Sequence, residues 1–118
     1  MTHTLSLSDL KKLKEMIGGD IGDLAELVSD FVAELPAQLA QMRAQSAADD
    51  WAGLRITAHS CKSNARDLGA STLSEQCARL ETQCARGEVQ AIDAQLAEIT
   101  KSADIALAEY EKLDLSDV

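Results

Sequence analysis

The sequence predicts an all-α protein: an antiparallel up-down-up-down four-helix bundle with a short additional N-terminal helix. Apolar residues recur at spacings of three and four through most of the chain, which is the period of an amphipathic helix. Ala, Leu, Glu and Gln dominate the composition and favour helix, whereas aromatic residues make up only 3%, which argues against a β-sandwich. The connections between the long apolar stripes are short, which favours antiparallel neighbours.

The first predicted helix is short, and a long helix follows it. Ser6 or Ser8 can cap the short helix, and the pair Gly18–Gly19 ends it. Asp20 can cap the long helix, whose apolar stripe continues in phase beyond Pro36. Proline removes one backbone donor, so we expect one helix that bends at this residue rather than two separate helices.

Three further helices are predicted from capping residues and apolar stripes. They extend from a cap at Asp49 or Asp50 to Gly69, from Thr72 to Gly87, and from Ile92 to Leu113. Thr72 and Glu75 have the spacing of a capping box. Gly69 and Gly87 suit the left-handed conformation that ends a helix. The last residues, 115–118, are expected to fray.

Length and charge limit the possible classes of protein. A chain of 118 residues has room for one core, so we expect residues 1–118 to form a single domain. The net charge of -9 disfavours nucleic acid or an anionic membrane as a partner. No apolar run approaches the roughly 20 residues that cross a bilayer, and residues 1–5 lack a signal-peptide pattern. We therefore expect a cytoplasmic protein.

The cysteines indicate neither a disulfide framework nor a metal site. Their number, three, is odd, and no pair has the C-x-x-C spacing. Cys61, Cys77 and Cys84 all fall on apolar helix stripes, where a reduced cysteine acts as a small apolar residue. The spacings do not fit zinc ligands, so we expect no metal in this chain.

One helix face carries a histidine where the apolar pattern predicts exposure to water. The predicted buried stripe of that helix consists of Leu54, Ala58, Cys61, Ala65 and Leu68. At about 100° per residue, His59 falls about 150° from the middle of this stripe. Its neighbours on the exposed side are Arg55, Ile56, Lys62, Ser63 and Arg66. An exposed imidazole beside three cations, in a protein of net charge -9, indicates a functional site.

The residues around His59 suit phosphoryl transfer. A neutral imidazole nitrogen is a nucleophile, and its attack on a phosphoryl group gives a phosphoramidate that can pass the group on. Such transfer depends on positioning and on cations, and Lys62 can supply a positive charge from the same side of the helix. Ser63 is small and leaves a partner room to approach. The expected docking residues are Arg55, Ile56 and Arg66.

The run His59-Ser60-Cys61-Lys62-Ser63-Asn64-Ala65-Arg66-Asp67-Leu68-Gly69-Ala70 follows an alanine and has a lysine three positions after its histidine. It resembles the signature of histidine-containing phosphotransfer (HPt) domains, His-x-x-Lys-Gly/Ser-Ser-x-x-x-Leu-Gly-Ala. The resemblance covers about residues 20–87, including the upstream run 27–36 and the downstream pair Leu80-Glu81. It implies that His59 accepts the phosphoryl group and that Lys62 assists.

Three positions depart from the family pattern. Ser63 stands where glycine is most common, Asn64 where serine is frequent, and Cys61 where leucine is usual. Serine is still small, so we expect reduced clearance around the histidine rather than a blocked site. The change at Cys61 lies on the core side of the helix.

The leading hypothesis is a histidine phosphotransfer protein of a multistep His-Asp phosphorelay. His59 would shuttle the phosphoryl group between receiver-domain aspartates, with response-regulator receiver domains or a hybrid histidine kinase as partners. The chain has no nucleotide loop or kinase catalytic motif, so we expect a phosphocarrier rather than an enzyme. No cofactor is expected in this chain, and Mg²⁺ would lie in the partner receiver domain. We expect a monomer.

Three alternatives remain open on the sequence. The chain could be the substrate HPt domain of a chemotaxis-type kinase, phosphorylated directly by a kinase domain. It could be a non-catalytic helical adaptor in which His59 is an ordinary solvated side chain and the cations only aid solubility. A dimerising kinase hairpin is disfavoured, because its histidine is normally followed by an acidic residue and here Ser60 follows.

Overall fold

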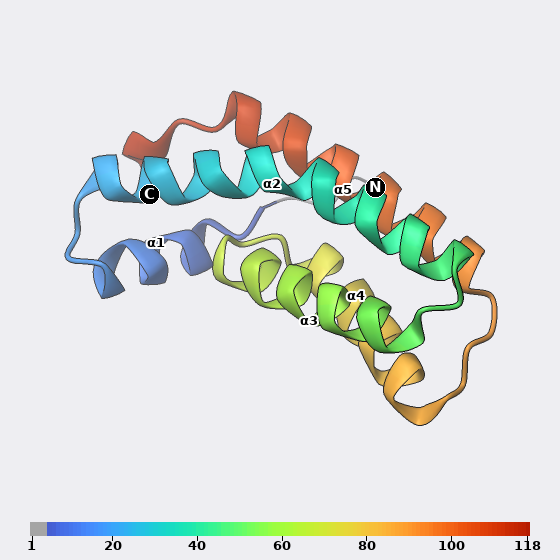
Figure 1. Cartoon of the computed structure of the whole chain (residues 1–118). Coiled ribbons are helices and arrows are strands. Elements are labelled where there is room, and N and C mark those ends of the chain that lie inside the picture. The colour runs from blue at the N-terminus through green and yellow to red at the C-terminus, as the bar shows by residue number, and fades with distance from the viewer. Residues whose placement is uncertain (1–4) are drawn as a thin grey trace.

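A computed structural model describes residues 5–118, which form five α-helices and one short 3₁₀ helix (Figure 1). The elements are α1 (Leu7–Met16), α2 (Ile21–Ala47), α3 (Trp51–Asp67), α4 (Ser71–Arg86), α5 (Ile92–Lys112) and η1 (Leu115–Asp117). No strand occurs among these residues, so the all-helical prediction is confirmed. Residues 1–4, which entered the signal-peptide argument, lie outside the described residues. Within the described part, no helix is both long and apolar enough to span a bilayer.

The four long helices enclose one apolar core. α2 packs against α3 and α5, and α4 packs against the same two helices, which closes a ring of contacts. Leucine, isoleucine, alanine and cysteine side chains from all four helices are buried inside it. α1 extends beyond the end of α3 along the first half of α2, and it buries Leu10 completely (Figure 1).

Capping residues explain where the first three helices begin. The side chains of Ser6, Asp20 and Asp50 accept hydrogen bonds from backbone N–H groups in the first turns of α1, α2 and α3. Each such cap stabilises its helix by about 1 kcal/mol. α2 continues through Pro36 as one helix, as its unbroken apolar stripe predicts.

The turn after α3 is held from two sides. Gly69 has φ +81, and a Cβ added there would lie 2.8 Å from the carbonyl oxygen of Ser6. The Ser6 N–H donates to the Gly69 carbonyl at 2.8 Å, and the buried Tyr110 hydroxyl donates to the Leu68 carbonyl at 2.6 Å. These bonds tie the end of α3 to both α1 and α5.

The predicted capping box at Thr72 and Glu75 is wrong. α4 begins at Ser71, and its N-cap residue Ala70 makes no side-chain cap hydrogen bond. The left-handed turn at Gly69 brings the Ala70 N–H to the carbonyl of Ala65 at 2.8 Å, so the chain re-enters a helix at once. Thr72 therefore lies within the first turn of α4 instead of capping it.

The prediction that residues 115–118 fray is also wrong. Residues 115–117 form η1, and the Asp114 carboxylate accepts a hydrogen bond from the Ser116 N–H at 2.9 Å. Leu115 and Val118 pack against the core, and the Lys14 ammonium donates to the Val118 main-chain oxygen. Burial of two apolar side chains therefore holds this segment in place.

Candidate functional site

His59 lies in the middle of α3 on the side that faces water. Its neighbours Ala58 and Cys61 are fully buried in the core. The His59 side chain is 58% exposed, as the helical wheel predicts. A protein partner can therefore reach the imidazole without any opening of the bundle.

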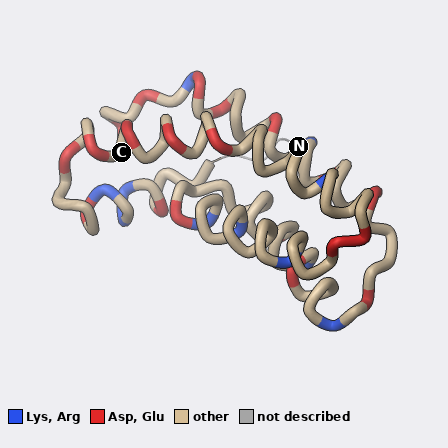
Figure 2. The backbone as a smooth tube through the Cα atoms, in the orientation of Figure 1, with Lys and Arg blue, Asp and Glu red and all other residues tan. Residues whose placement is uncertain are grey.

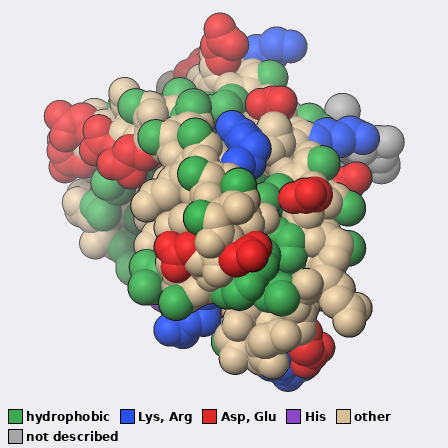
Figure 3. All heavy atoms as spheres, turned by 45° about the vertical axis from the view of Figure 1, so that its right-hand side comes forward, with side chains coloured by type: hydrophobic (Ala, Val, Ile, Leu, Met, Phe, Trp, Pro, Cys, Tyr) green, Lys and Arg blue, Asp and Glu red, His purple; other side chains and the backbone are tan. Residues whose placement is uncertain are grey.

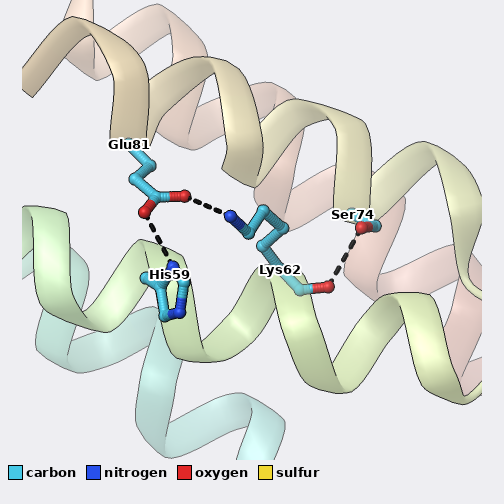
Figure 4. A network of polar contacts seen from close by, with 4 residues as sticks. All are labelled: His59, Lys62, Ser74 and Glu81. Atoms are coloured by element: carbon cyan, nitrogen blue, oxygen red, sulfur yellow. Dashed lines mark hydrogen bonds and ion pairs between the residues drawn. The ribbon is translucent and has the colours of Figure 1, made fainter.

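One carboxylate on the neighbouring helix α4 holds two of the site residues. Glu81 Oε2 lies 2.7 Å from His59 Nδ1, and Glu81 Oε1 accepts a hydrogen bond from Lys62 Nζ at 2.6 Å (Figure 4). In the sequence, Glu81 belongs only to the downstream part of the family resemblance, and no role is predicted for it. Its partners lie 22 and 19 positions away on another helix, so no spacing within one helix could have found it.

The environment of Glu81 keeps its carboxyl group ionised. Partial burial raises the pKa of Glu81, but hydrogen bonds from Lys62 and His59 and the charges of both leave that pKa below its ordinary value of 4.5. An ionised carboxylate can only accept hydrogen bonds, so His59 Nδ1 carries the proton in this contact. In the neutral ring, Nε2 then holds the free lone pair, and it points away from Glu81 (Figure 4).

A second contact between α3 and α4 lies beside the first. The buried Ser74 on α4 donates from its hydroxyl to the Lys62 carbonyl at 2.9 Å (Figure 4). Glu81 and Ser74 together bind the side chain and the main chain of the same residue of α3. This double contact joins α3 to α4 next to His59, in addition to the apolar packing between the two helices.

The structure brings only part of the predicted site together. Lys62 lies beside His59, but it is half-buried and its ammonium binds Glu81 instead of projecting freely into water. Ser63 is half-buried on the same helix.

The predicted docking residues lie on the surface. Ile56 is 61% exposed, so it does not pack into the bundle. Arg55 and Arg66 are also exposed, and Arg66 makes only a 3.7 Å ion pair with the exposed Asp67. An exposed ion pair of this kind contributes little to stability.

The three cysteines are free thiols, and none of them forms a disulfide. Cys61 and Cys77 are buried free thiols, and Cys84 is a half-buried one. Over residues 5–118, no group of three or more His, Cys, Asp or Glu side chains could hold a metal ion.

Comparisons with known proteins identify the family of this chain. The family model "Hpt domain" matches residues 26–113, well over half of the chain. The chain therefore belongs to the Hpt domain family, whose members are phosphocarrier modules of phosphorelays and not kinases. It is similar to the crystal structure of histidine-containing phosphotransfer protein B (HptB) from Pseudomonas aeruginosa PAO1, with a TM-score of 0.84, 27% sequence identity and 95% of each chain covered. No curated protein matches the chain.

Proposed function

We propose that this Hpt protein carries a phosphoryl group between the aspartates of two receiver domains, with His59 as the residue that becomes phosphorylated. The observation that carries the proposal is the placement of His59, which is exposed, held at Nδ1 by Glu81 and open at Nε2. A ring held in this way is oriented before a partner arrives, and orientation is a large part of what phosphoryl transfer needs.

The proposed step forms one bond and breaks one. The Nε2 lone pair attacks the phosphorus of a receiver phospho-aspartate, and an N–P bond replaces the P–O bond to the aspartate. The electron pair of the broken bond stays on the receiver carboxylate. The phosphorylated imidazole keeps its proton at Nδ1, where the negative charge of Glu81 offsets the positive charge of the ring. Transfer to a second receiver is the same step in reverse.

Lys62 is proposed to offset charge on the phosphoryl oxygens during transfer. It lies three residues after His59 on the same side of α3, and its ammonium is close to the ring because both bind Glu81. Ser63 is proposed to leave room for the receiver, and Arg55, Ile56 and Arg66 to contact it.

The Mg²⁺ that phosphoryl transfer requires is proposed to lie in the receiver. This cation prefers several oxygen ligands, and both oxygens of Glu81 already accept hydrogen bonds from Lys62 and His59. We also propose a cytoplasmic monomer with α2–α5 in up-down-up-down order. The reversal of direction from each helix to the next in Figure 1 supports that order, and the use of every long apolar stripe inside one bundle supports the monomer.

The proposal is tested by incubation with receiver domains that carry a labelled phospho-aspartate. We expect the protein to take up an acid-labile, alkali-stable label and His59→Gln to remove it. The chain has two histidines, so His3→Gln is the matched control and should keep the label. Labelling of His59→Gln would show that another residue is the acceptor. An adaptor would take no label, and a chemotaxis-type substrate domain would be labelled only by a kinase domain.

A further inference from the structure

The charges of this protein are divided between two faces of the bundle. α1 and α3 carry six of the eleven Lys and Arg residues and three of the twenty acidic ones, whereas α2 and α5 carry three basic and nine acidic residues. The backbone view shows blue positions along α1 and α3 and mostly red ones along α2 and α5 (Figure 2). A protein of net charge -9 therefore presents a basic face, and His59 lies on it.

A groove on this basic face lies between α1 and the end of α3. It is lined by Asp9, Lys12, Leu13, Met16, Arg66 and Asp67. Met16 is 83% exposed, the highest exposure of any large apolar side chain in the described residues. Figure 3 shows another face, over the opposite end of the long helices, where acidic and apolar side chains intermingle. The groove thus combines an exposed apolar side chain with one cation on each wall, Lys12 on α1 and Arg66 on α3, and each wall also carries one carboxylate.

The groove is continuous with the surface around His59. Arg66 lies two turns after His59 on the same face of α3, about 10 Å along the helix axis, and it forms one wall of the groove. The other wall, α1, packs against the bundle through the fully buried side chain of Leu10. In addition, the Ser6 N–H donates a hydrogen bond to the Gly69 carbonyl at 2.8 Å. A partner seated on His59 would therefore meet a fixed second surface.

The size of a protein interface also points to α1. A specific interface takes about 20–30 residues from each partner, more than the exposed strip of α3 can supply. α1 extends that strip beyond the end of α3 (Figure 1). The family match covers residues 26–113 and so excludes α1.

We propose that the groove between α1 and α3 is a second contact for the receiver domain that docks at His59, and that it selects among receivers. It would take an acidic side chain between Lys12 and Arg66 and a neighbouring apolar side chain against Leu13 and Met16. The inference rests on the proposed phosphotransfer function. α1 lies outside the residues that the family model matches, so its side chains can favour the receivers that fit this particular chain.

The test measures transfer from a panel of phosphorylated receiver domains to the whole protein. For the receiver that wild-type protein uses best, we expect Lys12→Glu to raise KM about tenfold at low salt, with a smaller effect at high salt. Met16→Ser should raise KM for the same receiver at either salt concentration. Lys101→Glu on α5 changes the net charge equally on the acidic side and should behave like wild type.

Each further outcome decides the matter. Equal KM values for wild type, Lys12→Glu and Met16→Ser with every receiver would overturn the inference, as would an equal effect of Lys101→Glu. Sedimentation showing a wild-type dimer that Lys12→Glu dissociates, with transfer unchanged, would assign the groove to a second copy instead. If wild-type protein takes no label from any receiver, it is the proposed function that fails. Lys12 and Met16 are both exposed, so circular dichroism should show unchanged folding for Lys12→Glu and Met16→Ser.

Discussion

Glu81 accepts a hydrogen bond from His59 at 2.7 Å across the contact between α3 and α4, although the two residues are 22 positions apart in the chain. The Glu81 carboxylate binds Nδ1 of the imidazole and leaves Nε2 accessible to a partner. It also binds Lys62, so one side chain of α4 positions two residues of α3.

Removal of the Glu81 carboxylate should slow phosphoryl transfer without unfolding the protein. We expect Glu81→Ala to reduce the transfer rate about tenfold, because the ring then loses its fixed orientation and tautomer. Glu81→Gln should recover part of the rate, since its amide oxygen can still accept from Nδ1. Nitrogen NMR of the imidazole should show less of the Nδ1-protonated tautomer in Glu81→Ala. An unchanged tautomer and rate would exclude a positioning role.

Acid should weaken the contact between α3 and α4. The pKa of Glu81 is lower in the folded protein than its ordinary value of 4.5, so its contribution to stability is complete above that value. The contribution is lost as the pH falls through the lowered folded-state pKa. Urea unfolding at a series of pH values measures the free energy of unfolding. On acidification this free energy should fall less for Glu81→Gln than for wild type. Parallel curves for the two proteins would contradict this prediction.

Lys62→Ala should slow transfer about tenfold while helical content stays the same. Removal of a charged donor from an enclosed site costs about 10²–10³ in rate, and we expect less here because the site is open to water and screened. Transfer reactions quenched at a series of times measure the rate, and circular dichroism measures the helix content. Lys101→Ala is the matched control on another face, and an effect as large as that of Lys62→Ala would indicate a general loss of charge.

Ile56→Asp should weaken receiver docking and leave stability within about 0.5 kcal/mol of wild type, because the side chain is exposed. The expected change is a higher KM for the receiver at an unchanged melting temperature. Ile99→Asp is the contrasting variant, since Ile99 is buried and the charge should unfold the bundle. A large fall in melting temperature for Ile56→Asp would show that it belongs to the core.

Gly69→Ala should destabilise the protein more than Gly87→Ala. Both glycines have positive φ, so each substitution carries a backbone penalty of about 1–2 kcal/mol. A Cβ at Gly69 would also meet the Ser6 carbonyl oxygen, whereas nothing lies within 4 Å of one at Gly87. Thermal unfolding of the two variants measures the difference, which should vanish if the contact with Ser6 is unimportant.

The features that sequence alone predicts here are those set by local periodicity. The apolar stripes identified all five helices, and the wheel placed His59 on the exposed face, because both depend only on neighbouring residues of one helix. Asp20 caps its helix as predicted, and Ser6 and Asp50 are each one of the two candidates that the sequence offers, for the same reason.

Most of the errors and omissions involve contacts between residues that are distant in the sequence. Glu81 reaches His59 only because α3 and α4 pack together, and the Lys14 ammonium meets Val118 from 104 positions away. The motif at Thr72 has the spacing of a cap, but α4 already begins at Ser71 with Ala70 as its N-cap, so Thr72 lies inside the helix. Local rules cannot rank such competing contacts.

The hydrogen bond between Ser6 and Gly69 has a practical consequence for anyone who trims this domain. A fragment cut at the boundaries of the family match would discard α1 and the first turn of α2, and with them the fully buried side chains of Leu10 and Leu24. It would also remove the Ser6 N–H that donates a hydrogen bond to the Gly69 carbonyl, in the turn between α3 and α4. Excised versions should therefore retain the first helix if they are to report on the native relay.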